Sequence, residues 1–330
     1  RCGEFDFKIK LWNTDCPNLY DVEFILRGRG KVLDRVGSYF GLRKIETDEK
    51  GIRFNNAQFY QKLVLAQNYW PETGPDEEAG RKDILLAKQA GFNGLRIHQK
   101  IEDERFLFLC DTEGLLVWAE YPATYEFNDR AISAIAAEWL EAVRQQYNHP
   151  CVIAWVPFNE SWGIPNVYTD KLQQRFTEGI YYLTKAFDAM RPVMCNDGWE
   201  HTCSDIVTVH DYDGCVERGN DRYKNDMKDI LDNKIAPTNY RFVMAKGYEY
   251  QGQPIVVSEY GGFKLAGTEG WGYDGEAKDA EDLVRKYDEI TSAYKKMEKV
   301  CGFCYTQLTD VYHETNGLMS FDRTPKVPLK

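Results

Sequence analysis

Long hydrophobic runs are missing from this sequence of 330 residues, which nowhere approaches the roughly 18 uninterrupted apolar residues that a membrane span needs. A surplus of positive charge is missing as well, because 41 Lys and Arg stand against 52 Asp and Glu. A nucleic-acid binder is expected to carry a clustered basic patch. We therefore expect neither a membrane nor a nucleic acid as a partner. With 43% hydrophobic and 28% charged residues the proportions are globular, which argues against disorder, collagen and coiled coil.

Metal-ligand patterns are equally scarce. The chain has only five His, and no second Cys or His pair lies at partnering distance from Cys301-Gly-Phe-Cys304. We therefore expect no metal and no cofactor. The nine Cys are an odd number and several lie inside apolar runs, as Cys151 does, so we interpret them as buried thiols. Such thiols favour a reducing compartment, the cytoplasm, although a removed N-terminal region could have carried a signal peptide.

The first 46 residues have the pattern of antiparallel strands. Residues 5–10, 20–26 and 36–45 are short alternating stretches broken by Asn, Asp, Pro and Gly. Three strands cannot close a sandwich alone. Either they pair with the main domain, or they are the end of a β-sandwich whose beginning is missing. We therefore predict two domains, 1–46 and 47–330.

From about Gly51 strands alternate with helices. Apolar residues at three- and four-residue steps predict helices over 132–147, 172–187 and 283–297, and Gly91 follows a further helical stretch as a C-cap. Short apolar runs, which suit parallel strands buried on both faces, lie at 63–67, 94–97, 115–119, 152–158, 192–196, 206–210, 255–259 and 302–306.

Eight strands in about 250 residues predict a (β/α)8 TIM barrel. A doubly wound parallel sheet is the alternative. Such a sheet usually carries a Gly-rich phosphate turn after its first strand, and residues 67–71 contain no glycine. The barrel is therefore the favoured fold.

Two of the predicted strands end in a carboxylate. Glu160 follows the fourth strand and Glu259 ends the seventh, each beside aromatic residues and glycines. Catalytic groups of a barrel stand at the C-terminal ends of its strands, and the fourth and seventh strands face each other across the mouth. Paired carboxylates are what glycoside hydrolysis needs, one as acid and one as nucleophile. The alternative is that both are structural ion-pair partners.

The motifs around these two residues resemble glycoside hydrolase family 2, the β-galactosidase, β-glucuronidase and β-mannosidase family. Residues 148–162 resemble its acid/base signature and residues 258–261 its nucleophile strand. Residues 91–96 resemble its second barrel strand and residues 110–117 lead into its third. Residues 11–20 and 36–43 resemble the last strands of the immunoglobulin-like sandwich that precedes the barrel.

The resemblance implies roles for individual residues. Glu160 would be the acid/base and Glu259 the nucleophile of a retaining enzyme, with carboxyl groups about 5–5.5 Å apart rather than the roughly 6.5–9.5 Å of an inverting enzyme. Asn159 would bind the sugar 2-hydroxyl, and Arg96 would lie beside Glu259 and keep it ionised. The other expected substrate contacts are His98, Trp162, Trp199, His210, Tyr212 and Trp271.

Several features limit what the resemblance implies. For His98 and for each Trp, plain packing is the alternative interpretation. The Asn-x-Lys pair that a β-glucuronidase uses against its substrate's carboxylate has no clear counterpart. The leading prediction is a retaining, exo-acting β-glycosidase of β-galactosidase type acting on an oligosaccharide or glycoside. The alternatives are a non-catalytic carbohydrate-binding fragment, or β-glucuronidase, β-mannosidase or arabinofuranosidase specificity. A homo-oligomer assembled through domains missing here is compatible with each.

Overall fold

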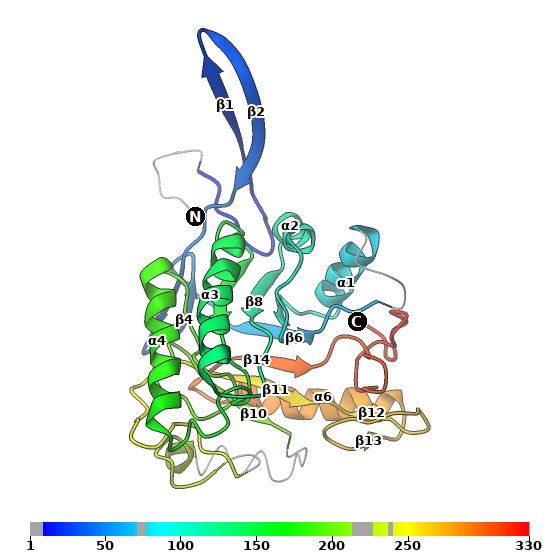
Figure 1. The fold of residues 1–330 in the computed structure, drawn as a ribbon. Helices are drawn as coiled ribbons and strands as arrows, with labels where there is room; N and C mark the ends of the chain where they lie inside the picture. The colour runs from blue at the N-terminus through cyan, green and yellow to red at the C-terminus, as the bar shows by residue number, and fades with distance from the viewer. Residues whose placement is uncertain (1–8, 71–76, 213–226, 237–239, 330) are drawn as a thin grey trace.

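A curled parallel sheet forms the centre of the protein (Figure 1). The computed structural model describes residues 9–70, 77–212, 227–236 and 240–329. Seven strands run in the order β10-β11-β14-β6-β7-β8-β9, each parallel to its neighbours. Every one lies within two residues of a predicted strand. Their bounds are β6 (Gln61–Ala66), β7 (Gly94–Ile97), β8 (Leu116–Glu120), β9 (Val152–Val156), β10 (Val207–Asp211), β11 (Ile255–Gly261) and β14 (Val300–Thr306).

The remaining predicted strand, 192–196, is not a regular strand, and this part of the prediction is wrong. The segment runs beside β9 with only two isolated bridges, Trp155 to Val193 and Asn159 to Asp197. Side chains take the place of ladder partners, because Asp205 accepts from the Val193 N–H and Ser204 from the Cys195 N–H, each at 2.9 Å.

The irregular segment still fills the eighth position of the barrel. It hydrogen-bonds to β9 through Trp155 N and Pro192 O (3.0 Å), and the carbonyl of Gly198 accepts from His210 N of β10 at 3.3 Å. The (β/α)8 barrel predicted from the sequence is therefore confirmed. At one of its eight strand positions the chain is irregular and is held mainly by hydrogen bonds to side chains.

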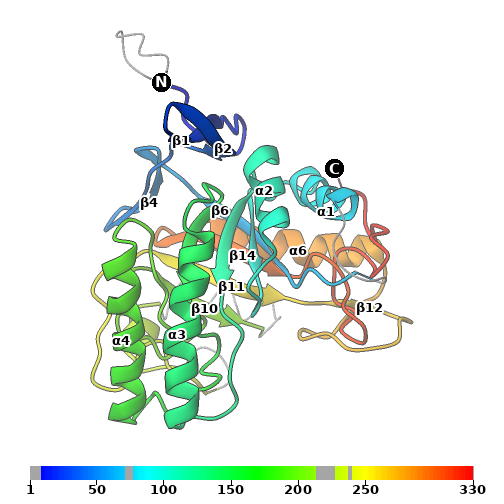
Figure 2. The same ribbon diagram turned by 45° about the horizontal axis from the view of Figure 1, so that its top comes forward.

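Helices cover the outside of the sheet, and α3 and α4 lie side by side (Figures 1 and 2). Their bounds are α1 (Glu77–Gln89), α2 (Glu104–Glu113), α3 (Asp129–Gln146), α4 (Lys171–Phe187) and α6 (Ala280–Lys295). Local sequence explains where they start, since Asp103, Asn128, Asp170 and Asp279 each cap a helix by accepting a backbone N–H. The predicted helices over 132–147, 172–187 and 283–297 are confirmed as α3, α4 and α6. None of the helices in the described ranges is long and apolar enough to cross a membrane.

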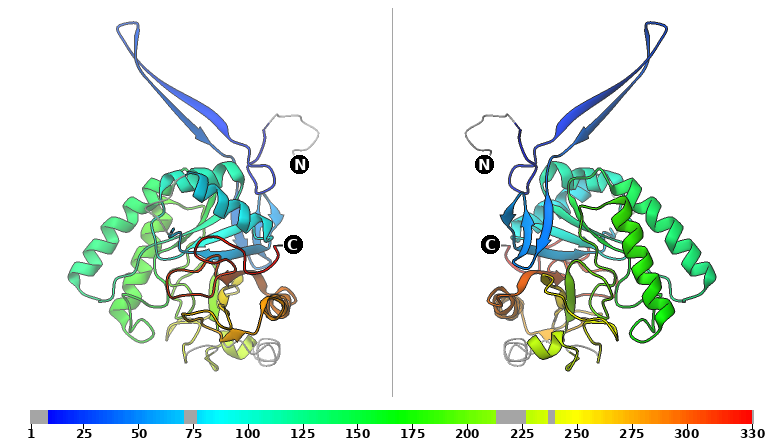
Figure 3. Two further views of the ribbon diagram at one scale, coloured as in Figure 1. Left: turned by 90° about the vertical axis from the view of Figure 1, so that its right-hand side faces the viewer. Right: turned by 90° about the vertical axis from the view of Figure 1, so that its left-hand side faces the viewer.

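A long antiparallel hairpin, β1 (Tyr20–Gly28) and β2 (Lys31–Phe40), projects away from the barrel (Figure 3). The predicted strand 20–26 lies within β1. The predicted strand 36–45 is wrong as one element, because β2 ends at Phe40 and the chain then leaves the hairpin to accept the Trp12 N–H at Leu42 O (2.8 Å). The predicted strand 5–10 lies almost wholly outside the described residues.

Three short strands follow the hairpin and pair antiparallel, β3 (Ile45–Asp48), β4 (Gly51–Phe54) and β5 (Ala57–Gln58). This small sheet spans the predicted domain boundary after residue 46, which stays a prediction. The segment before the barrel is attached at the N-terminal end of β9, where Arg43 donates to the carbonyls of Pro150 (3.0 Å) and Val152 (2.8 Å).

Candidate active site

The two predicted catalytic carboxylates meet at the C-terminal end of the barrel. Glu160 follows β9 and Glu259 lies in β11, and one oxygen of each lies within 4.8 Å of the other and of a His210 ring nitrogen. Glu160 and Ser161 both have positive φ, 53° and 60°, and the Glu160 N–H donates to Asp197 O at 2.9 Å. The turn after β9 is therefore held in an unfavourable backbone conformation at the residue whose side chain enters the site.

Arg96, in β7, links several polar side chains of the site to one another. Its side chain is fully buried, and Nη1 donates to Glu259 Oε1 at 2.5 Å while Nη2 donates to Asn159 Oδ1 at 2.6 Å. Its Nε lies 2.8 Å from Asp197 Oδ2 and contacts Glu120. The predicted contact between Arg96 and Glu259 is confirmed.

Glu259 is held as an anion. Burial alone would raise the pKa of its carboxyl group, but the charges of His210, Arg96 and His98 and the hydrogen bond from Tyr212 outweigh burial and lower it to about 2. The Tyr212 hydroxyl donates to Oε2 at 2.5 Å. Tyr212, which the sequence analysis expected to contact the substrate, thus contacts the predicted nucleophile Glu259.

His210 lies between the two carboxylates. Its Nδ1 is 2.8 Å from Glu160 Oε1 and 3.5 Å from Glu259 Oε2, and its Nε2 is 3.1 Å from Asp197 Oδ2. Burial lowers the pKa of His210, but these three carboxylates outweigh burial and raise it to about 10, so the ring carries a positive charge at neutral pH.

A glycine is required beside this ring. Gly198 has φ of +99°, and a Cβ at that position would lie 2.7–2.8 Å from His210 ring atoms. Any other residue there would both strain the backbone and displace the histidine.

His98, at the barrel mouth, is one-fifth exposed. Its Nδ1 lies 3.3 Å from Glu120 Oε2 and 4.0 Å from Glu259 Oε1. Burial is the largest single effect and lowers the pKa of His98, but the hydrogen bond and charge of Glu120 together with the charge of Glu259 outweigh burial and raise it. His98 is therefore close to the predicted nucleophile, as expected for a group on the substrate side.

The sequence analysis missed two buried acids of this site, Glu120 and Asp197. Both bind Arg96, and the charge of Arg96 together with His210 holds the pKa of Asp197 well below its usual range although burial opposes this. Glu120 is the last residue of β8, and Asp197 follows the irregular segment. The rule that found Glu160 and Glu259, a carboxylate at the end of an apolar run, would have found both.

The three predicted tryptophan platforms differ in exposure. Trp199 is 7% exposed and packs edge-on against His210, with ring centroids 5.5 Å apart. Trp162 and Trp271 are each 46% exposed. Trp271 packs edge-on against Tyr273, which in turn stacks on Tyr212 at 4.3 Å. Tyr273, which the sequence analysis did not single out, therefore joins Trp271 to the residue that holds Glu259.

Polar side chains close the mouth between β14 and β6. Gln67 donates to both Glu314 and Gln307 at 3.1 Å, and Gln307 donates to Asn316 at 2.8 Å. Asn316 donates back to Glu314 at 3.3 Å. The sequence analysis did not identify this group.

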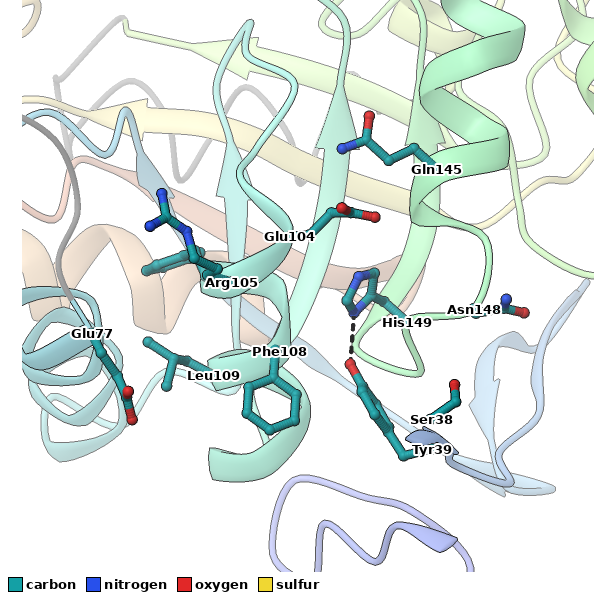
Figure 4. A pocket seen from close by; sticks show the side chains of 11 residues that line it. Ser38, Tyr39, Glu77, Glu104, Arg105, Phe108, Leu109, Gln145, Asn148 and His149 are labelled. Atoms are coloured by element: carbon teal, nitrogen blue, oxygen red, sulfur yellow. Dashed lines mark hydrogen bonds between the residues drawn. The ribbon is translucent and has the colours of Figure 1, made fainter. Parts of the chain in front are cut away.

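A second cluster lies at the opposite end of the barrel, beside a pocket of about 630 Å³ (Figure 4). His149, which precedes β9, lies 2.6 Å from Asp111 Oδ2, and the Tyr39 hydroxyl of β2 donates to the same oxygen at 2.7 Å. These contacts join the hairpin to the barrel, which indicates a structural role for His149. The pocket is remote from both candidate catalytic carboxylates.

Two groups among the described residues have ligand atoms close enough for a metal, Glu160 with His210 and Glu259, and Asp111 with His149 and Cys151. In the first group His210 is protonated at neutral pH and has no lone pair to offer. In the second, burial raises the pKa of Cys151 well above its usual value, whereas a thiol must lose its proton to bind a metal.

Comparison with known proteins agrees with this geometry. The family model described as "Glycosyl hydrolases family 2, TIM barrel domain" matches residues 49–330, and "Glycosyl hydrolases family 2" matches residues 5–43. A β-galactosidase of Lactococcus lactis is 30% identical over 214 residues, which are 60% of this chain and 20% of the relative. The chain therefore spans about a fifth of the length of such relatives.

Two solved structures share the fold. A β-galacturonidase of Eisenbergiella tayi bound to galacturonate superimposes with a TM-score of 0.78 at 21% identity, covering 97% of this chain and 58% of that one. A β-glucuronidase of Bacteroides uniformis gives a TM-score of 0.77 at 21% identity, covering 97% of this chain and 40% of that one. At this identity the likeness concerns the fold alone.

Proposed function

Since the chain belongs to glycoside hydrolase family 2, we propose that it is the catalytic part of a retaining, exo-acting β-glycosidase of β-galactosidase type. In this proposal Glu259 is the nucleophile and Glu160 the acid/base. The β-galactosidase among its relatives supports the choice of sugar. The substrate is a glycoside or oligosaccharide with a terminal β-linked sugar.

The observation that carries the proposal is the short separation of the two carboxylates. Oxygens of Glu160 and Glu259 lie within 4.8 Å of each other. Retaining glycosidases have carboxyl groups about 5–5.5 Å apart, whereas inverting enzymes need about 6.5–9.5 Å to hold a water molecule between them. The spacing therefore favours direct attack by one carboxylate over activation of a water.

In the first step, a Glu259 oxygen forms a bond to the anomeric carbon while the bond from that carbon to the leaving oxygen breaks. Glu160, as the acid, transfers its proton to the leaving oxygen. In the second step Glu160 takes a proton from water, the water oxygen bonds to the anomeric carbon and the Glu259 ester breaks. Two inversions give net retention.

Asn159 is equipped to hold the sugar 2-hydroxyl. Its Oδ1 accepts from Arg96, which orients the amide, and its buried Nδ2 has no hydrogen-bond partner within the part of the chain that the structure describes. An unpaired buried donor is costly, so a hydroxyl that accepts from it contributes binding energy. Contacts to the 2-hydroxyl strengthen in the transition state of this reaction.

The Glu259→Gln variant tests the nucleophile. Replacing the anion by a neutral amide removes the attacking group, so kcat should fall about 10³-fold or more. Release of nitrophenol from aryl β-galactosides measures the effect, with Glu249→Gln, an exposed glutamate, as the control. Sugar binding without hydrolysis by the unaltered protein would instead favour the alternative of a non-catalytic carbohydrate-binding fragment.

The Glu160→Ala variant tests the acid/base and the stereochemistry together. It should still react in the first step with dinitrophenyl glycosides, whose good leaving groups need little protonation. Azide needs no general base, so it should restore turnover and yield the β-glycosyl azide, identified by proton NMR. Formation of the α-azide would mean that the mechanism is not double displacement.

Free thiols support a cytoplasmic location. The cysteines in the described ranges form no disulfides. Cys110, Cys151, Cys195 and Cys304 are buried and Cys203 and Cys301 are half-buried, whereas Cys16 is exposed, so the interpretation as buried thiols is wrong for Cys16. Buried free thiols are typical of reducing compartments.

A further inference from the structure

The loop after β14 forms a wall beside the nucleophile strand. It is joined to the turn between β12 (Lys264–Leu265) and β13 (Glu276–Ala277), because Trp271 N donates to His313 O at 2.9 Å and Thr315 N donates to Trp271 O at 3.0 Å. Three residues after Glu259, a Cβ on Gly262 would lie 3.3 Å from Asn316 Nδ2. The amide of Asn316 is therefore next to the end of β11.

Glu314 presents a carboxylate from this wall. Gln67 Nε2 donates to its Oε2 at 3.1 Å and Asn316 Nδ2 to its Oε1 at 3.3 Å. Burial and the charge of Glu259 raise the pKa of Glu314, while His98 acts in the opposite direction. Both Glu259 and His98 are therefore near enough to interact with Glu314 electrostatically.

The described part of the mouth has no surplus positive charge for an anionic sugar. Its carboxylates are Glu120, Glu160, Asp197, Glu259 and Glu314, and its cations are Arg96, His98 and His210. Each cation already contacts at least one of these carboxylates. Lys100, close by in sequence, is 3.4 Å from Glu102 and donates to Asn68 O at 3.0 Å. Lys326, which donates to Thr315 O at 2.9 Å, is paired with Asp310 at 2.6 Å.

We infer that Glu314 is a specificity residue that selects neutral sugars and rejects hexuronides, with Gln67 and Asn316 holding its carboxylate in place. This inference rests on the proposed glycosidase function. A sugar hydroxyl can donate to Glu314 and accept from the second N–H of the Asn316 amide, since both N–H groups of Gln67 are already donated. A sugar carboxylate can donate nothing and meets a like charge without a free cation to offset it.

The test compares kcat/KM for 4-nitrophenyl β-galactoside and β-galacturonide, which differ only at C6. The unaltered enzyme should favour the galactoside by about tenfold or more, because the C6 carboxylate of the galacturonide meets the like charge of Glu314. Glu314→Gln, which removes the charge and keeps the shape, should lower this ratio by about tenfold, mainly by raising kcat/KM for the galacturonide. Glu298→Gln, an exposed charge at the other end of β14, is the matched control and should leave the ratio unchanged.

Inhibition of the unaltered enzyme by galactose and by galacturonate provides a measurement that needs no variant, and galactose should inhibit more strongly. Preference for the galacturonide, or an unchanged ratio in Glu314→Gln, would overturn the inference and leave the glycosidase proposal intact. If neither glycoside is hydrolysed, the proposed function fails. Calorimetric titration with galactose and with galacturonate then tests the selectivity of the wall independently of hydrolysis.

Discussion

Two opposing effects act on the single carboxyl group of Glu259. Burial raises its pKa, while the charges of His210, Arg96 and His98 lower it. The charges outweigh burial, so the pKa is about 2. With a pKa of about 2, the carboxyl group of Glu259 is ionised at neutral pH. The cost of burying the anion is offset by the guanidinium of Arg96 and the imidazolium of His210, and His98 acts in the same direction.

His210→Gln should move the acid limb of the pH profile. The charge of His210 makes the largest contribution that lowers the Glu259 pKa, so its loss should raise that pKa while burial continues to act. The acid limb of kcat/KM reports this group in the free enzyme. We expect the limb to shift to higher pH by about one unit or more. Exposed His313→Gln is the control, and an unmoved limb in His210→Gln would contradict the electrostatic account.

The same pair makes stability depend on pH in a defined way. The pKa of His210 rises on folding from 6.5 to about 10, so its contribution is complete below about 6.5 and is lost as pH rises toward 10. The pKa of Glu259 falls from 4.5 to about 2, so its contribution is present above about 4.5 and is lost as pH falls toward 2. Urea unfolding between pH 7 and 10 should show a steeper loss of stability for the unaltered protein than for His210→Gln.

At the scale of elements, the ends of parallel strands assemble the site while buried packing holds the strands in place. Trp12 belongs to the segment that precedes the hairpin, yet it is fully buried, donates to Asp111 O at 2.7 Å and packs edge-on against Phe54. This segment therefore contributes to the stability of the barrel's N-terminal end.

Trp12→Ala and Trp162→Ala form a matched pair that separates packing from function. Trp12→Ala should lower the free energy of unfolding by about 3–5 kcal/mol, because it leaves a cavity. Trp162→Ala, at a side chain that is 46% exposed, should cost less than about 1 kcal/mol and should instead raise KM for the glycoside. Denaturant unfolding and steady-state kinetics measure the two effects. Equal destabilisation would contradict the assigned burial.

At the scale of the whole molecule, the β1–β2 hairpin carries a group of exposed apolar side chains. One face carries Phe24 and Val36 directly opposite each other, 62% and 54% exposed, and Leu26 on the same face is 60% exposed. Exposed apolar faces and free strand edges promote association.

Phe24→Lys should therefore reduce concentration-dependent self-association of the 330-residue chain. Light scattering coupled to size-exclusion chromatography measures the change. Ile25→Lys is the matched control, because this substitution adds the same charge on the opposite face of the hairpin, where Ile25 pairs with Arg35. Equal effects of the two substitutions would mean that net charge, rather than the apolar face, controls association.

The sequence by itself determined the barrel and the two carboxylates at its mouth. Apolar runs separated by helical periodicity specify buried parallel strands, and the C-terminal ends of such strands must meet at one edge of the barrel. A carboxylate directly after a run, as at Glu160 and Glu259, is therefore placed in the mouth whatever the details of packing.

The tertiary structure alone decided how the other groups of the site are held. The contacts of Arg96 with Glu120 and Asp197, and the position of His210 between two acids, join residues far apart in the chain, and no local pattern encodes such distances. The irregular segment at 192–197 and the wall around Glu314 arise for the same reason. Their backbone and side chains take hydrogen-bond partners from remote segments, which local propensity cannot anticipate.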